Sequence, residues 1–61
     1  SLDLLFIDNN NTIINIAKNA EPLNKSSIYS DKPARYVLEI NAGLSDLWGL
    51  KPGDKIRFTK L

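Results

Sequence analysis

Cysteine, histidine and methionine are all missing from this sequence of 61 residues. Without cysteine there is no disulfide, and without cysteine or histidine the common structural zinc patterns are excluded. A chain this short buries only about 60% of the surface that its unfolded form exposes, and small domains commonly compensate with such a staple. The sequence therefore predicts stabilisation by core packing, by self-association, or by further chain preceding Ser1, as in a fragment of a longer protein.

Strong charge and long apolar runs are missing as well. Eight basic residues face seven acidic ones, so the net charge is +1 and gives no strong nucleic-acid or membrane signal. The longest apolar run, Leu4 to Ile7, is far shorter than the ~20 residues that a membrane-spanning helix needs. No signal peptide is visible in the printed residues. With 43% hydrophobic and 25% charged residues, the composition is typical of a folded globular protein.

The first part of the chain has the pattern of a β-hairpin. Strands are predicted near residues 2–7 and 12–17, separated by Asp8 and three asparagines that favour a turn. In the first strand, Leu2, Leu4 and Phe6 alternate with Asp3, Leu5 and Ile7. Because both sets contain large apolar residues, both faces of this strand are expected to be covered. A free two-stranded ribbon could not cover them.

The middle of the chain, residues 18–33, has no sustained period of a strand or a helix. Pro22, Pro33 and several serines favour turns, which predicts a long loop. Leu23, Ile28 and Tyr29 lie within it, and we expect them to pack the loop against the rest of the domain.

The second half predicts a strand, a short helix, a turn and a strand. Alternation returns over residues 35–40, and Asn41 is expected to cap a helix over 42–48. Leu44, Leu47 and Trp48 share one helical face, which predicts a buried Trp48. Gly49 is placed to end the helix with a left-handed residue, and "KPGD" (51–54) has the pattern of a type II turn. A strand over 55–60 is expected to point Ile56 and Phe58 inward.

Together these elements predict a mainly β (α+β) fold. We expect a small antiparallel sheet or half-barrel with one short helix, completed by missing chain or by a partner. Residues 1–61 form either a single domain or the C-terminal part of a larger β domain.

Residues that could carry catalysis are few. A Ser–Lys nucleophile could arise only among neighbours such as Ser26, Ser27, Lys25 and Lys32. The carboxylates that could converge into an acid–base pair are Asp3, Glu39 and Asp54. Solvated loop residues and solvent-facing strand charges are the simpler interpretations. We therefore assign no catalytic residue, and the enzyme question stays open with a preference for no activity.

Binding residues are equally sparse. Asp8 with Asn9 to Asn11 offers oxygen ligands for calcium, but one carboxylate is weak and a hairpin turn is preferred. Trp48 and Tyr36 could stack on a ligand, although core positions are expected. The basic residues Lys51, Lys55, Arg57 and Lys60 could touch phosphates, although a solvated face is expected. No cofactor or metal is assigned.

The order of motifs resembles a known family. "LDLLFID", "INIAKNAEPL", "YVLEINAG" and "GLKPGDKI" closely resemble the family called domain of unknown function 192, found in bacteria and archaea. The resemblance runs from Leu2 to about Phe58 and implies the C-terminal half of a compact, mostly β domain. It also implies export or a periplasmic location for bacterial members, and it implies no activity, cofactor or catalytic residue.

A shorter resemblance, over Leu50 to Phe58, is to swapped-hairpin DNA-binding dimers of the AbrB type. The predicted function is therefore a non-catalytic binding or accessory module with an unknown ligand. A DNA-binding dimer and a carboxylate-dependent enzyme with part of its site in missing chain are the alternatives. The expected partner is the missing N-terminal half or a second copy of the chain.

Overall fold

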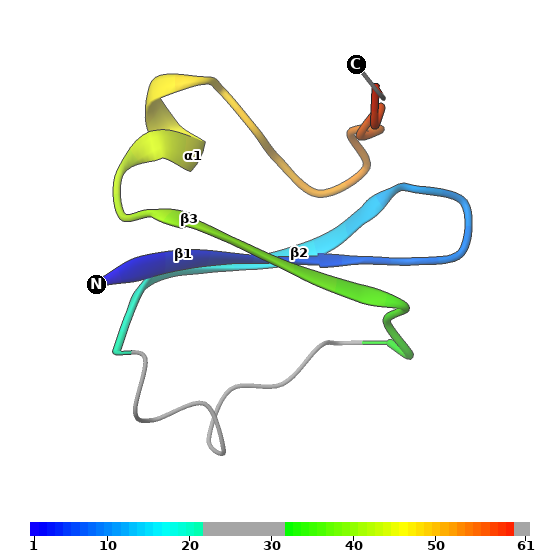
Figure 1. Ribbon diagram of the computed structural model, residues 1–61, viewed down its shortest axis with the longest axis horizontal. Helices are drawn as coiled ribbons and strands as arrows, with labels where there is room; N and C mark the ends of the chain where they lie inside the picture. Colours follow the sequence, from blue (N-terminus) through cyan, green and yellow to red (C-terminus); the bar gives the residue numbers. More distant parts are fainter. Residues whose placement is uncertain (22–31, 60–61) are drawn as a thin grey trace.

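The computed structural model describes residues 1–21 and 32–59 of the chain. Strands β1 (Leu2–Ile7), β2 (Ile13–Ala20) and β3 (Tyr36–Asn41) form one antiparallel sheet in the order β2-β1-β3, followed by helix α1 (Leu44–Leu47) (Figure 1). The predicted mainly β fold with one short helix is confirmed. The expected packing of Leu23, Ile28 and Tyr29 falls outside the described residues.

The predicted hairpin joins β1 to β2 through an asparagine-rich turn. Asp8 N–H donates to the Thr12 carbonyl (3.0 Å), and the Asp8 carboxylate accepts hydrogen bonds from the backbone N–H groups of Asn10 (2.8 Å) and Thr12 (3.0 Å). Asn11 takes a positive φ of 60°, which asparagine tolerates better than most residues. Asp8 therefore stabilises the turn through one of its own oxygens.

Strand β2 extends beyond the predicted range of residues 12–17, because its pairing with β1 continues to Ala20 past a β-bulge. The register passes from Leu4 opposite Ala17 to Leu2 opposite Ala20, so β2 holds one extra residue at this point. Asn19 lies at this bulge and has a positive φ of 54°, and its N–H donates to the Asp3 carboxylate (3.0 Å). A side chain of β1 thus replaces a backbone partner there.

The core is built on the central strand. Both faces of β1 are covered as predicted, because residues 3–7 are all buried. Leu5, Ile7 and Ile13 form the core cluster on one face, and the half-buried apolar side chains packed against them are Ile16, Leu38, Ile40, Leu50 and Ile56. Leu5 and Ile7 are therefore covered by the chain itself, and their burial requires neither a second copy nor further chain.

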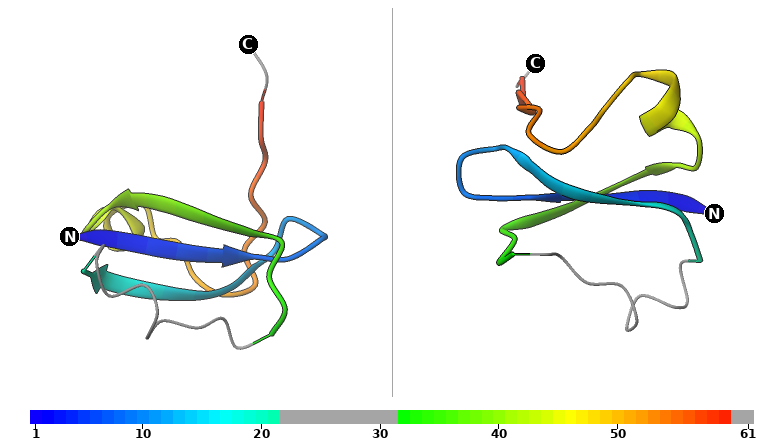
Figure 2. Two further views of the ribbon diagram at one scale, coloured as in Figure 1. Left: turned by 60° about the horizontal axis from the view of Figure 1, so that its bottom comes forward. Right: turned by 180° about the vertical axis from the view of Figure 1, so that it is seen from behind.

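Helix α1 lies on one side of the sheet, together with the segment that follows it (Figures 1 and 2). Its C-terminal end is as predicted: Gly49 has a φ of 67°, Gly49 N–H donates to the Asp46 carbonyl (3.1 Å), and Leu50 N–H donates to that of Ser45 (2.8 Å). This pair of hydrogen bonds is a Schellman motif. It turns Leu50 back onto the core.

The beginning of α1 and the place of Trp48 differ from expectation. Asn41 ends β3 instead of capping the helix, and the N-cap residue is Gly43. Trp48 is 58% exposed and Leu47 75% exposed, so the predicted burial of Trp48 is wrong. Ser45 is fully buried, and at about 100° per residue Leu47 lies on the opposite side of the helix, whereas Trp48 is the C-cap residue that follows the last helical residue.

The C-terminal segment keeps the predicted turn but not the predicted strand. Gly53 has a φ of 93° and Asp54 N–H donates to the Lys51 carbonyl (3.1 Å), as a type II turn requires. Beyond it, the described residues form a single bridge, between Lys55 and Thr12, and the chain then stands away from the sheet (Figure 2). Ile56 packs against the core, but Phe58 is exposed, which corrects its expected inward position.

Candidate binding surface

The three carboxylates that could have formed an acid–base site are not brought together. Asp3 and Asp54 bind opposite ends of β2: Asp3 accepts from Asn19, whereas the Asp54 carbonyl accepts from Ile13 N–H (2.8 Å). Glu39 lies on β3 with an exposed side chain. Among the described residues, no group of three acidic residues, histidines or cysteines could hold a metal ion. The geometry offers no paired carboxylates in this part of the chain.

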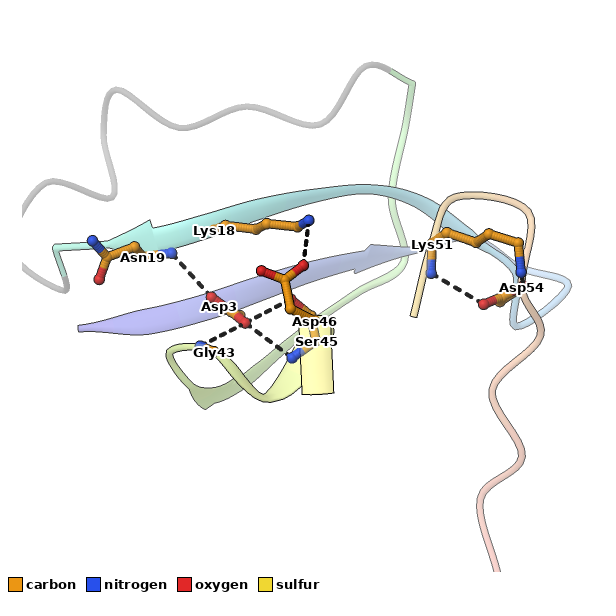
Figure 3. A network of polar contacts seen from close by, with 8 residues as sticks. All are labelled: Asp3, Lys18, Asn19, Gly43, Ser45, Asp46, Lys51 and Asp54. Atoms are coloured by element: carbon orange, nitrogen blue, oxygen red, sulfur yellow. Dashed lines mark hydrogen bonds and ion pairs between the residues drawn. The ribbon is translucent and has the colours of Figure 1, made fainter. Parts of the chain in front are cut away.

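Asp3 departs from the solvent-facing position expected for it, because it is 1% exposed. One carboxylate oxygen accepts hydrogen bonds from the N–H of Gly43 (3.1 Å), the N–H of Ser45 (3.1 Å) and the hydroxyl of Ser45 (2.6 Å), and the other accepts from Asn19 N–H (Figure 3). A side chain from β1 therefore caps α1 and fastens the end of β2. Asn41 was expected to supply that cap.

These hydrogen bonds also fix the charge of Asp3. The Ser45 hydroxyl, followed by the Asn19 N–H, lowers the pKa of the Asp3 carboxyl from 3.8 to about 2, against the opposing effect of desolvation. The carboxylate is ionised at neutral pH and both of its oxygens are engaged. It is a structural anion and is poorly placed to act as an acid or a base.

Two exposed ion pairs occupy several of the remaining charges. Lys18 pairs with Asp46 (2.7 Å), which raises the pKa of Lys18, and Lys51 pairs with Asp54 (2.9 Å), which lowers the pKa of Asp54 (Figure 3). Because Lys51 is paired with Asp54, its charge is partly neutralised, and Lys51 contributes less to the predicted basic face. Lys55 and Arg57 lie further along the chain, and Lys60, like Ser26, Ser27 and Lys25, falls outside the described residues.

Among the described residues, the large apolar side chains that remain exposed lie in two places. Leu47 ends α1 and Trp48 is its C-cap, whereas Tyr36 and Val37 on β3 lie near Phe58 of the C-terminal segment. The rings of Tyr36 and Phe58 are 5.9 Å apart between centroids, and the Arg35 guanidinium lies 5.4 Å from the centre of the Tyr36 ring. Tyr36 and Trp48 thus belong to separate surfaces.

A hollow of about 330 Å³ opens between β3 and the C-terminal segment, lined by Tyr36, Val37, Leu38 and Phe58. We call it the β3 hollow. It lies at the outer edge of the sheet, since β3 has β1 on one side and no strand of the described chain on the other. An extended peptide can bind a protein by adding a strand to an exposed sheet edge, with pockets beside the edge receiving alternate side chains.

The backbone of β3 shows which groups face this edge. Ala42 N–H donates to the Ser1 carbonyl (3.3 Å) in the register that pairs Asn41 with Leu2. Because the N–H groups of a strand alternate between its two sides, the N–H and C=O of Val37 point away from β1. Val37 therefore presents a donor and an acceptor at the mouth of the β3 hollow.

The domain of unknown function 192, described as "Uncharacterized ACR", matches residues 1–58. The chain belongs to this family. Neither the curated proteins nor the solved structures include a significant match.

The match confirms the resemblance to domain of unknown function 192. It adds no activity, because the family is uncharacterised. No helix in the described part of the chain is long and apolar enough to cross a membrane.

Sequence reasoning missed the residues that shape the β3 hollow. Phe58 was expected inside a strand and Tyr36 inside the core, whereas both are on the surface and in contact. Residues 53–56 form backbone hydrogen bonds to residues 11–13, but within the described chain this pairing does not continue to Phe58. Without the strand, Phe58 has no sheet face to join.

Proposed function

We propose that this member of the domain of unknown function 192 family is a non-catalytic binding module. Its partner is an extended strand that adds to β3 at the β3 hollow. The observation that carries the proposal is the outward N–H and C=O of Val37 beside the exposed side chains of Tyr36 and Phe58. The separation of Asp3, Glu39 and Asp54 supports a binding role over a carboxylate-dependent enzyme.

We propose further that the strand is β3 of a second copy. A two-fold axis at Val37 would pair the N–H and C=O of Val37 with those of its counterpart. It would also set Tyr36 opposite Leu38 and Arg35 opposite Glu39 of the other copy. Opposite charges and apolar pairs directly across two strands are favourable. The edge is therefore complementary to itself in this register.

The expected association is weak. A contact along a single strand of six residues is smaller than the roughly 1,000 Å² typical of stable interfaces. The dimer is therefore expected to form at high concentration and to dissociate on dilution. Sedimentation equilibrium over micromolar to millimolar concentrations measures this directly.

Charge reversal tests the register. Arg35→Glu places like charges opposite each other twice in the dimer, and at about 0.2–1 kcal/mol for each exposed pair the dissociation constant should rise by several-fold or more. The double variant Arg35→Glu with Glu39→Arg restores opposite charges and should recover the dimer. Lys51→Glu, which lies away from β3, is the control. A monomer at every concentration would overturn the proposal.

The β3 edge also provides a test for the other predicted partner, the missing N-terminal half. If chain preceding Ser1 occupies β3, a protein carrying that chain stays monomeric and its Val37 amide is protected from hydrogen exchange. Strand addition would then stand, with a different source for the strand. The DNA-binding alternative has less support, because the net charge is +1 and Lys51 is paired with Asp54. Binding to duplex DNA that falls steeply with salt would favour it.

A further inference from the structure

A second hollow adjoins the β3 hollow at Phe58, which lines both. Its volume is about 450 Å³, within the range of small-molecule sites. The residues that line it are Asn10, Asn11, Lys55, Ile56, Arg57 and Phe58. They come from the hairpin turn and from the C-terminal segment, which are far apart in the sequence. We call it the hairpin hollow.

The two walls of the hairpin hollow are held together by hydrogen bonds. Lys55 pairs with Thr12 in the isolated bridge, and Ile56 N–H donates to the Asn11 carbonyl (2.8 Å). The Lys55 ammonium donates to the Asn10 carbonyl (3.1 Å), which keeps this cation at the rim. The site is therefore ordered before any ligand binds, which lowers the entropy lost on binding.

Its lining is cationic and rich in hydrogen-bond donors. Lys55 and Arg57 supply positive charge, and the side-chain amides of Asn10 and Asn11 can donate further hydrogen bonds. No carboxylate lines the hollow. Asp54, which precedes Lys55, is paired with Lys51, and Asp8 directs one oxygen to the N–H groups of Asn10 and Thr12. The positive charges of Lys55 and Arg57 are therefore not balanced by any carboxylate among the residues that line the hollow.

We infer that the hairpin hollow binds a small organic oxyanion, with a phosphate or carboxylate group held by Lys55 and Arg57. Arginine matches the planar geometry of such groups, and lysine adds a point charge. The Phe58 ring gives one wall an apolar surface, so the ligand carries a flat apolar part beside its anionic group. This site shares Phe58 with the β3 hollow, but its cationic residues, Lys55 and Arg57, have no part in the proposed strand addition at β3.

The test is a titration of the ¹⁵N-labelled chain followed by NMR. Phenyl phosphate and benzoate are the probes, with inorganic phosphate lacking the ring and benzyl alcohol lacking the charge. We expect saturable shifts at the amides of Asn10, Asn11 and Arg57 with the two aromatic anions. Phosphate should bind more weakly and benzyl alcohol should not saturate. Which aromatic anion binds more tightly decides between phosphate and carboxylate.

Variants separate the site from general charge effects. Arg57→Gln and Lys55→Gln should each weaken binding roughly two- to fivefold, as the loss of one exposed charge contact predicts. Lys51→Gln removes the same charge outside the hollow and should leave binding unchanged. Equal weakening by all three variants, or shifts spread over every lysine and arginine, would overturn the proposal. Absence of saturable shifts with both aromatic anions would overturn it as well.

Discussion

Replacing Ser45 by alanine tests the network that joins β1 to α1. Ser45 is fully buried, and its hydroxyl makes the shortest of the hydrogen bonds to Asp3, at 2.6 Å. Alanine fits the same space but leaves one lone pair of a buried carboxylate without its donor. The same oxygen keeps the N–H donors of Gly43 and Ser45, so the variant removes one of the three hydrogen bonds that this oxygen accepts.

The magnitude follows from the type of bond that is lost. A hydrogen bond to a charged group contributes about 1.5–3 kcal/mol, so Ser45→Ala should lower the free energy of unfolding by that amount. For a chain of this size, 1 kcal/mol corresponds to roughly 4–8 °C in the melting temperature. The expected loss is therefore roughly 6–24 °C. Thermal unfolding followed by circular dichroism measures it.

The pH dependence gives a second measurement of the same contact. The pKa of Asp3 is lowered from 3.8 to about 2 in the folded chain, so its contribution to stability is complete above 3.8 and is lost as the pH falls to about 2. Since the Ser45 hydroxyl is the main cause of the lowered pKa, Ser45→Ala should move the pKa back toward 3.8. The stability curves of the two proteins should then converge over this interval.

Ser1→Ala is a matched control, because Ser1 is exposed and its side chain has no part in the network. The Ser1→Ala variant should have the same melting temperature as the unaltered chain. The reasoning would be refuted if Ser45→Ala melted at the same temperature as the control while the Asp3 carboxyl, followed by carbon-13 NMR, still titrated near 2.

Three further predictions concern packing and the turn. Trp48→Ala should change stability by less than about 0.5 kcal/mol because Trp48 is mostly exposed, and its fluorescence should be red-shifted and open to quenchers; a blue-shifted emission would contradict its position. Leu5→Ala should cost about 2–5 kcal/mol in urea unfolding, since Leu5 is fully buried, and a loss below that range would mean that the core is loosely packed. Gly53→Ala should cost about 1–2 kcal/mol through its positive φ, whereas Lys51→Ala should be nearly silent; equal melting of the glycine variant and the unaltered chain would disprove the turn.

Elements set by local pattern were predictable. The alternation of β1, the asparagine turn, the strand at β3, Gly49 and the turn before Asp54 all depend on a few neighbouring residues, and each is confirmed. Burial of both faces of β1 also followed from its composition. The candidate surface was not predictable in the same way. Tyr36 and Phe58 meet only because a segment near the C-terminus returns to the first residue of β3.

The sequence by itself determined the fold class, the family and the lack of thiol or imidazole chemistry, because these depend on composition and on short-range patterns. Tertiary structure alone decided the role of Asp3. Its carboxylate is forty-two positions from Ser45 in the chain, yet it caps α1 and makes Ser45 the buried residue of the helix. Leu47, two residues after Ser45, therefore faces the solvent. A helical pattern of one turn is too short to fix which face is buried, so a single long-range hydrogen-bonded anion decides it.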